Sequence, residues 1–117
     1  GYGQANISIS KENQKEIPYQ CSIQNVTKDF PTIFSIQTLE GQTPTLKPGE
    51  VFISESSAKK IFGAESPIGK QLLFPDRGNA EMTIVAVVKS WEGHSMYPLF
   101  HNQRRYQGFS GWDTGKE

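Results

Sequence analysis

Residues 51–63, VFISESSAKKIFG, constrain the fold most, because the spacing of apolar residues changes within this one run. The first four residues are mostly β-branched or aromatic, which is typical of a strand. The next residues place apolar side chains at positions i, i+3 and i+4 of one helical face: Ala58, Ile61 and Phe62. Ser54 is a favourable N-cap, and Gly63 is typical of the residue that ends a helix. The run therefore predicts a strand that leads directly into one short helix.

Alternating apolar and polar residues predict further strands around this helix. ANISIS at residues 5–10 and YQCSIQNV at 19–26 alternate as half-buried strands do, and TIFSIQTLEG at 32–41 carries apolar residues on both faces. KQLLF at 70–74 predicts a short strand. MTIVAVVKSW at 82–91 predicts a central strand, because it is apolar on both faces. The expected fold class is therefore α+β, with a mixed β-sheet and one short helix packed on it.

The length and the charge of the chain exclude several classes of protein. At 117 residues the chain is expected to form a single domain, residues 1–117. Twelve basic residues balance twelve acidic ones, so no net field attracts nucleic acid, and no nucleic-acid partner is expected. Cys21 is the single cysteine and is expected to be a buried thiol. No apolar run reaches the roughly 20 residues that span a bilayer, so membrane attachment is expected only through segments outside this sequence.

Residues 61–71, IFGAESPIGKQ, have only a superficial likeness to a phosphate-binding loop. Five residues separate Gly63 from Gly69 where that loop has four, and Gln71 stands where the loop needs a hydroxyl. Pro67 lacks an amide donor, and a helix precedes the glycines where a strand is required. Both glycines are therefore expected to serve the backbone, and we predict neither a nucleotide nor another cofactor.

No set of residues in the sequence has the pattern of a catalytic or metal site. His94 and His101 lie seven residues apart, and neither this spacing nor the nearby acids match a metal-ligand pattern. The sequence has no nucleophile-elbow motif, and its acidic residues are scattered over expected loops and helix ends. We therefore predict no catalytic residue, no metal ligand and no enzymatic activity.

Residues 93–117 form a segment rich in aromatic residues and arginine. Arg104 and Arg105 are interleaved with rings, as in modules that bind single strands, although the zero net charge favours rings that pack on the sheet. This region is also a candidate surface for partner proteins, because it is aromatic and partly apolar. The candidate partner-binding residues are Trp91, Met96, Tyr97 and Phe100.

The motifs between residues 29 and 92 resemble the MacB-like periplasmic core domain, found in ABC transporter permeases of the MacB/FtsX/LolE type. VFISESSAKKIFG, ESPIGKQLLF and MTIVAVVKS follow one another as the strand, helix, turn and strands of that family do. Upstream, DFPTIFSIQTLEGQTP resembles the family's lead-in, F-F-x-x-F-x-x-x-x-L-x-G. The sequence departs from the pattern at Pro31 and Thr32, where a second aromatic residue is usual, and at Ala86, where glycine is usual.

The resemblance implies a function that the composition alone does not. It implies a βαβ-type subdomain, without catalytic residues, on the periplasmic (extracytoplasmic) face of a bacterial cytoplasmic membrane. Such a domain couples ATP-driven conformational change in a permease to export, or to lipoprotein or peptide handling, through protein–protein contacts. The implied partners are a cognate cytoplasmic ATPase, a second copy of the permease, and a periplasmic adaptor or cargo. The alternative is a free-standing extracytoplasmic module that binds peptide or glycan through the aromatic residues and arginines of 93–117.

Overall fold

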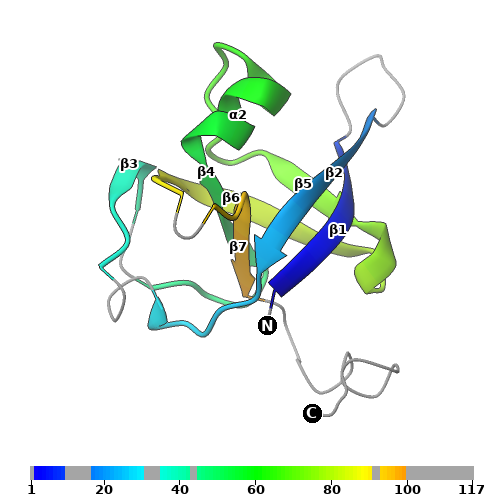
Figure 1. The fold of residues 1–117 in the computed structure, drawn as a ribbon, viewed down its shortest axis with the longest axis horizontal. Helices are drawn as coiled ribbons and strands as arrows, with labels where there is room; N and C mark the ends of the chain where they lie inside the picture. The colour runs from blue at the N-terminus through cyan, green and yellow to red at the C-terminus, as the bar shows by residue number, and fades with distance from the viewer. Residues whose placement is uncertain (1, 10–16, 31–34, 43–44, 91–92, 100–117) are drawn as a thin grey trace.

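The computed structural model of the chain describes residues 2–9, 17–30, 35–42, 45–90 and 93–99. Within these residues one short helix accompanies a sheet, which confirms the expected α+β class. The elements, labelled in Figure 1, are β1 (Tyr2–Ile9), β2 (Ile17–Gln24), β3 (Thr38–Gly41), β4 (Glu50–Ser54), α2 (Glu55–Phe62), β5 (Gln71–Phe74), the 3-10 helix η1 (Pro75–Arg77), β6 (Ala80–Val88) and β7 (Met96–Leu99).

The strands form one mixed sheet that curls round until it closes. The strand order is β3-β6-β4-β7-β2-β1-β5, and β5 also pairs with β6. Six strands therefore make a ring, while β3 lies outside it along the second half of β6. The backbone pairing is narrowest at two seams, where single residue pairs join β1 to β5 and β2 to β7. The sequence predicted the mixed sheet but not its closure.

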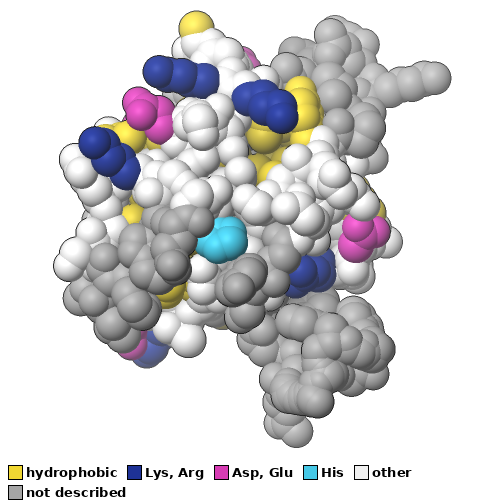
Figure 2. All heavy atoms as spheres, in the orientation of Figure 1, with side chains coloured by type: hydrophobic (Ala, Val, Ile, Leu, Met, Phe, Trp, Pro, Cys, Tyr) yellow, Lys and Arg dark blue, Asp and Glu magenta, His cyan; other side chains and the backbone are white. Residues whose placement is uncertain are grey.

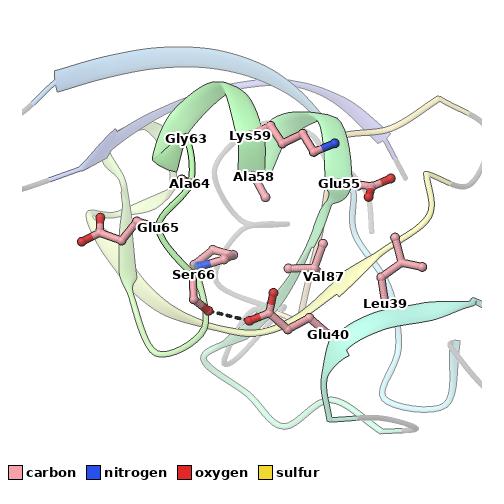
Figure 3. A pocket seen from close by; sticks show the side chains of 11 residues that line it. Leu39, Glu40, Glu55, Ala58, Lys59, Gly63, Ala64, Glu65, Ser66 and Val87 are labelled. Atoms are coloured by element: carbon pink, nitrogen blue, oxygen red, sulfur yellow. Dashed lines mark hydrogen bonds between the residues drawn. The ribbon is translucent and has the colours of Figure 1, made fainter.

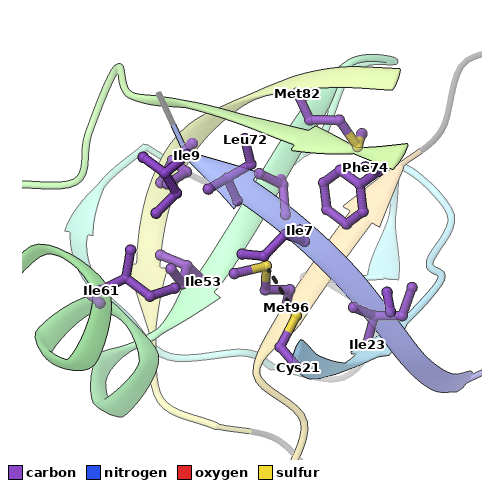
Figure 4. Packing of buried hydrophobic residues seen from close by; sticks show 14 of the residues in the cluster. Ile7, Ile9, Cys21, Ile23, Ile53, Ile61, Leu72, Phe74, Met82 and Met96 are labelled. Atoms are coloured by element: carbon purple, nitrogen blue, oxygen red, sulfur yellow. Dashed lines mark hydrogen bonds between the residues drawn. The ribbon is translucent and has the colours of Figure 1, made fainter. Parts of the chain in front are cut away.

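A bulge in β6 lets this strand contribute to two apolar clusters. Where β6 runs parallel to β4, the register shifts between Ile84 and Ala86, so Val85 is the extra residue. The inner cluster draws on all six strands of the ring and is drawn in Figure 4; it includes Ile7, Ile23, Ile53, Leu72, Phe74, Met82 and Met96. The outer cluster contains Val26, Phe30, Leu46, Phe52, Ala86, Val88 and Tyr97. The central position predicted for this strand is confirmed.

The helix α2 begins and ends at the residues that the sequence predicts. The Ser54 hydroxyl oxygen accepts a hydrogen bond from the Ser57 amide at 3.3 Å. Gly63 has a positive φ of 63°, although its ψ of −126° lies outside the left-handed helical region, and its amide donates to the Lys59 carbonyl at 2.9 Å. The apolar face of the helix packs on the inner cluster through Ala58, Ile61 and Phe62.

Two parts of the sheet differ from the expectation. Within the described part of residues 32–41, only Thr38–Gly41 is strand, and Ser35 has a φ of 52°, which an extended strand does not allow. The strand β7 was not expected, because four residues are too few to show a period. It lies between β4 and β2, antiparallel to the former and parallel to the latter. The βαβ relation is present, because β4 and β6 are parallel neighbours connected through α2 and β5.

Candidate functional site

The amides around the two glycines of the loop-like stretch are engaged within the chain. The Gly69 amide donates to the Ile84 carbonyl at 2.8 Å, and the Lys70 amide donates to the Pro67 carbonyl at 3.0 Å. Gly69 also has a φ of 87°, a conformation that glycine adopts at little cost. These bonds hold the turn against β6, so the predicted backbone role of the glycines is confirmed.

The predicted partner-binding residues do not form a surface in the described part of the chain. Met96 is 0% exposed and Tyr97 is 1% exposed, because both belong to β7 in the interior of the sheet. The Cys21 thiol donates to the Met96 sulfur at 3.7 Å, and the Tyr97 hydroxyl donates to the His94 carbonyl at 3.0 Å. In this structure these two side chains are therefore core residues, and partner binding by them stays a prediction. Trp91 and Phe100 lie outside the described residues, and their partner binding stays a prediction.

The described residues contain no metal-binding cluster, and their one thiol is not activated. Within them, no group of three or more His, Cys, Asp or Glu side chains is close enough to hold a metal ion. Burial raises the pKa of the Cys21 thiol to about 11, with a smaller opposing effect of Lys60, so this thiol is not activated as a nucleophile. His101, Arg104 and Arg105 lie outside the described residues. A nucleic-acid, peptide or glycan site built on the two arginines stays a prediction.

The surface agrees with the zero net charge of the chain. On the face shown in Figure 2, the described basic and acidic side chains are dispersed over the surface rather than gathered by sign. Among the described residues, none of the helices is both long and apolar enough to cross a membrane.

A cleft of about 310 Å³ lies between α2 and β3 (Figure 3). One wall is α2, which contributes Glu55, Ala58 and Lys59. The opposite wall is β3, and the turn of residues 63–67 closes one end. Val87 of β6 also lines the cleft and is only 5% exposed. The cleft therefore combines apolar side chains with a charged rim. Sequence reasoning missed it, because its walls come from segments that become neighbours only when β3 pairs with β6.

Hydrogen bonds and a close backbone approach fix the β3 wall. The Ser66 hydroxyl donates to the Glu40 carboxylate at 2.5 Å, which joins the turn to β3 (Figure 3). At Gly41 the backbone lies so close to β6 that an added Cβ would be 2.3 Å from the Val85 carbonyl oxygen. The Gln42 amide donates to that same oxygen at 3.0 Å. The contacts that hold β3 against the turn and β6 therefore fix this wall of the cleft.

Comparisons with known proteins agree on one family. The family model described as the MacB-like periplasmic core domain matches residues 3–110, further at both ends than the motifs between residues 29 and 92 indicated. No curated protein matches the chain. The likeness therefore extends over β1 and β2, whose sequences gave no family signal.

Solved structures with the same fold come from several bacteria. The periplasmic region of MacB from Actinobacillus actinomycetemcomitans aligns with a TM-score of 0.67 and 15% identity, covering 94% of this chain and 49% of that one. The extracellular domain of YknZ, a noncanonic ABC-type transporter from Gram-positive bacteria, aligns with a TM-score of 0.64 and 20% identity, covering 92% and 56%. A domain of a putative permease from Porphyromonas gingivalis gives 0.61 and 17%, covering 86% and 52%. The chain thus spans about half the length of these structures.

Proposed function

The chain belongs to the MacB-like periplasmic core domain family, and from this we propose that it transmits ATP-driven motion in a permease to work outside the cytoplasmic membrane. The observation that carries the proposal is the match of the family model to residues 3–110, nearly the whole chain. The domain is extracytoplasmic, as the family is. Its proposed work is export, or the handling of lipoproteins or peptides, through contacts with other proteins.

The build of the domain supports a mechanical rather than a chemical role. The six strands of the ring enclose one close-packed apolar cluster, and because such interiors resist compression and transmit strain, the ring moves as a unit. Among the described residues no group of His, Cys, Asp and Glu side chains could hold a metal ion, and the one cysteine is buried. We propose that the domain is not an enzyme and that it acts through its surface.

The proposed partners follow from the transporter context. A cognate cytoplasmic ATPase supplies the energy through the full-length permease, and a second copy of the permease forms a homodimer with the first. A periplasmic adaptor or a cargo protein contacts the domain from outside. Attachment to the membrane is through segments outside this sequence.

Replacement of the domain in the full-length permease tests this proposal. Residues 3–110 are exchanged for a short Gly-Ser linker, and the protein is reconstituted with its ATPase in proteoliposomes. We expect basal ATP hydrolysis to persist within a few-fold, while substrate release on the extracytoplasmic side is lost. The variant Lys89→Gln, at an exposed position after β6, serves as a control that should retain both activities. Undiminished substrate release by the linker variant would refute the proposal.

A further inference from the structure

The cleft between α2 and β3 has an apolar component that is open to solvent. Leu39 on β3 is 39% exposed, which makes it the only exposed large hydrophobic side chain among the described residues. Figure 3 shows Leu39 and Val87 on the same side of the cleft, facing α2. Burying an exposed leucine against a partner side chain is favourable, and a single apolar residue suits a narrow ligand better than a broad interface.

The strand that carries Leu39 is an edge of the sheet. β3 is last in the strand order, and within the described chain it pairs only with β6. Three of its four residues, from Leu39 to Gly41, are exposed. An extended peptide can lie beside such an edge and satisfy its free backbone groups, with alternate side chains entering adjacent pockets.

The charged rim of the cleft favours a cationic ligand. Three glutamates, Glu40, Glu55 and Glu65, line the cleft together with one lysine, Lys59. At neutral pH the rim therefore has an excess of two negative charges, although the chain as a whole has none. One of these carboxylates, on Glu40, is already oriented by the Ser66 hydroxyl. Because the excess is local, it selects a ligand by charge at this place and not over the whole surface.

From the edge strand, the exposed leucine and the acidic rim together, we infer that the α2–β3 cleft binds an extended segment of a partner protein in which lysine or arginine stands two positions before and two positions after an apolar residue, so that all three side chains point to the same face. The apolar side chain packs on Leu39 and Val87, and the cations lie beside Glu55 and Glu65. This inference rests on the proposed function, since it names the place where an extracytoplasmic partner contacts the domain.

A second cleft provides an internal control. It has a volume of about 370 Å³ and lies at the seam between β1 and β5, where Lys70 and Glu81 line it with opposite charges. It has no excess of negative charge and no leucine as exposed as Leu39. A cationic peptide should therefore prefer the α2–β3 cleft, although the two concavities are of similar size.

Titration of the ¹⁵N-labelled 117-residue chain with two capped heptapeptides, TKTLTKT and TETLTET, tests the inference by NMR. We expect TKTLTKT to shift the amide signals of residues 39–40, 55–59 and 63–66, with a dissociation constant on the order of 1 mM at low salt. TETLTET should shift none of them. Raising the salt to about 0.3 M should weaken the binding several-fold, because the cations lie on an exposed rim.

Matched variants locate the contact. Leu39→Ser and Glu65→Lys each change an exposed side chain of the cleft and should weaken the binding of TKTLTKT about fivefold or more. Glu81→Lys makes the same charge change at the second cleft and should leave the affinity within about twofold. The NMR spectrum of each free variant should match the wild-type spectrum away from the substituted residue, which would show that the variant is folded.

Three results would overturn the inference: no shift in the cleft, equal binding of the two peptides, or shifts confined to the second cleft. Cleft signals that change with protein concentration, in the absence of peptide, would show that a second copy of the chain occupies the cleft instead. The titration is independent of the linker replacement in the permease. A permease that needs its domain, with a cleft that binds no peptide, would refute this inference and leave the proposed function standing.

Discussion

Replacing Gly41 by alanine should destabilise the domain, because an added Cβ has no room. The φ of Gly41 is +90°, and the Cβ would lie 2.3 Å from the Val85 carbonyl oxygen and 2.9 Å from the Ala86 Cα. Both of these atoms belong to the backbone of β6, so no rotation of a side chain relieves the contact. The carbonyl also accepts the Gln42 amide, so moving β3 outward weakens that hydrogen bond.

The expected cost has a conformational part and a steric part. Alanine at a positive φ costs about 1–2 kcal/mol of unfolding free energy. Displacing β3 adds about 1–3 kcal/mol for overpacking, and weakening the hydrogen bond adds about 1 kcal/mol. Gly41→Ala should therefore cost about 3–6 kcal/mol in all. Gly49 and Gly69 have nearly the same φ, 86° and 87°, but no atom lies within 4 Å of an added Cβ.

Urea denaturation followed by far-UV circular dichroism measures these costs. The controls Gly49→Ala and Gly69→Ala should each lose only the conformational part, about 1–2 kcal/mol. Gly41→Ala should also lower the midpoint of thermal unfolding by more than either control. If Gly41→Ala loses no more free energy than the two controls, β3 does not approach β6 as closely as described, and the wall of the cleft is misplaced.

Three further predictions concern the helix cap and the core. Ser54→Ala should lower the unfolding free energy by about 1 kcal/mol through loss of the N-cap, whereas Ser56→Ala, at an exposed neighbour, should change it little; equal losses in urea would contradict the cap. Met96→Ala should cost about 2–5 kcal/mol, because the side chain is fully buried, and a loss below about 1 kcal/mol would place it at the surface. The Cys21 pKa rises from 9.0 to about 11 on folding, so the folded state holds this proton more tightly. Stability should therefore be unaffected by this group below about pH 9 and fall towards pH 11, and Cys21→Ala should remove that fall, as urea titrations at each pH would show.

The elements that the sequence predicted best are those specified by local interactions. The predicted helix has the same bounds as the observed one, because its cap, its apolar face and its final glycine all lie within ten residues. The central strand was also predicted, because apolar residues on both faces require cover on both sides. The family resemblance rested on residues 29–92, which contain both of these elements.

The parts that the sequence did not predict depend on contacts between distant segments. Closure of the ring needs β5 to pair with both β1 and β6, which no local pattern encodes. Met96 and Tyr97 were assigned to a partner surface because aromatic and sulfur-containing residues suit interfaces, yet the same residues suit a core. The α2–β3 cleft was also missed because its walls are distant in the sequence. Leu39 is only one more apolar residue of a predicted strand until β3 is known to be the edge of the sheet.

The central claim is that the domain moves relative to the membrane segments of the permease when ATP is bound by the transporter. A spin label at Ser56→Cys, an exposed position on α2, reports this motion against a second label in the adjoining membrane segment of the full-length permease. The native Cys21 is buried and stays unlabelled. In nanodiscs with the ATPase, pulsed electron paramagnetic resonance should show a shift of the interlabel distance, on the order of 5 Å, between the nucleotide-free and ATP-trapped states. Identical distance distributions in the two states would contradict the account.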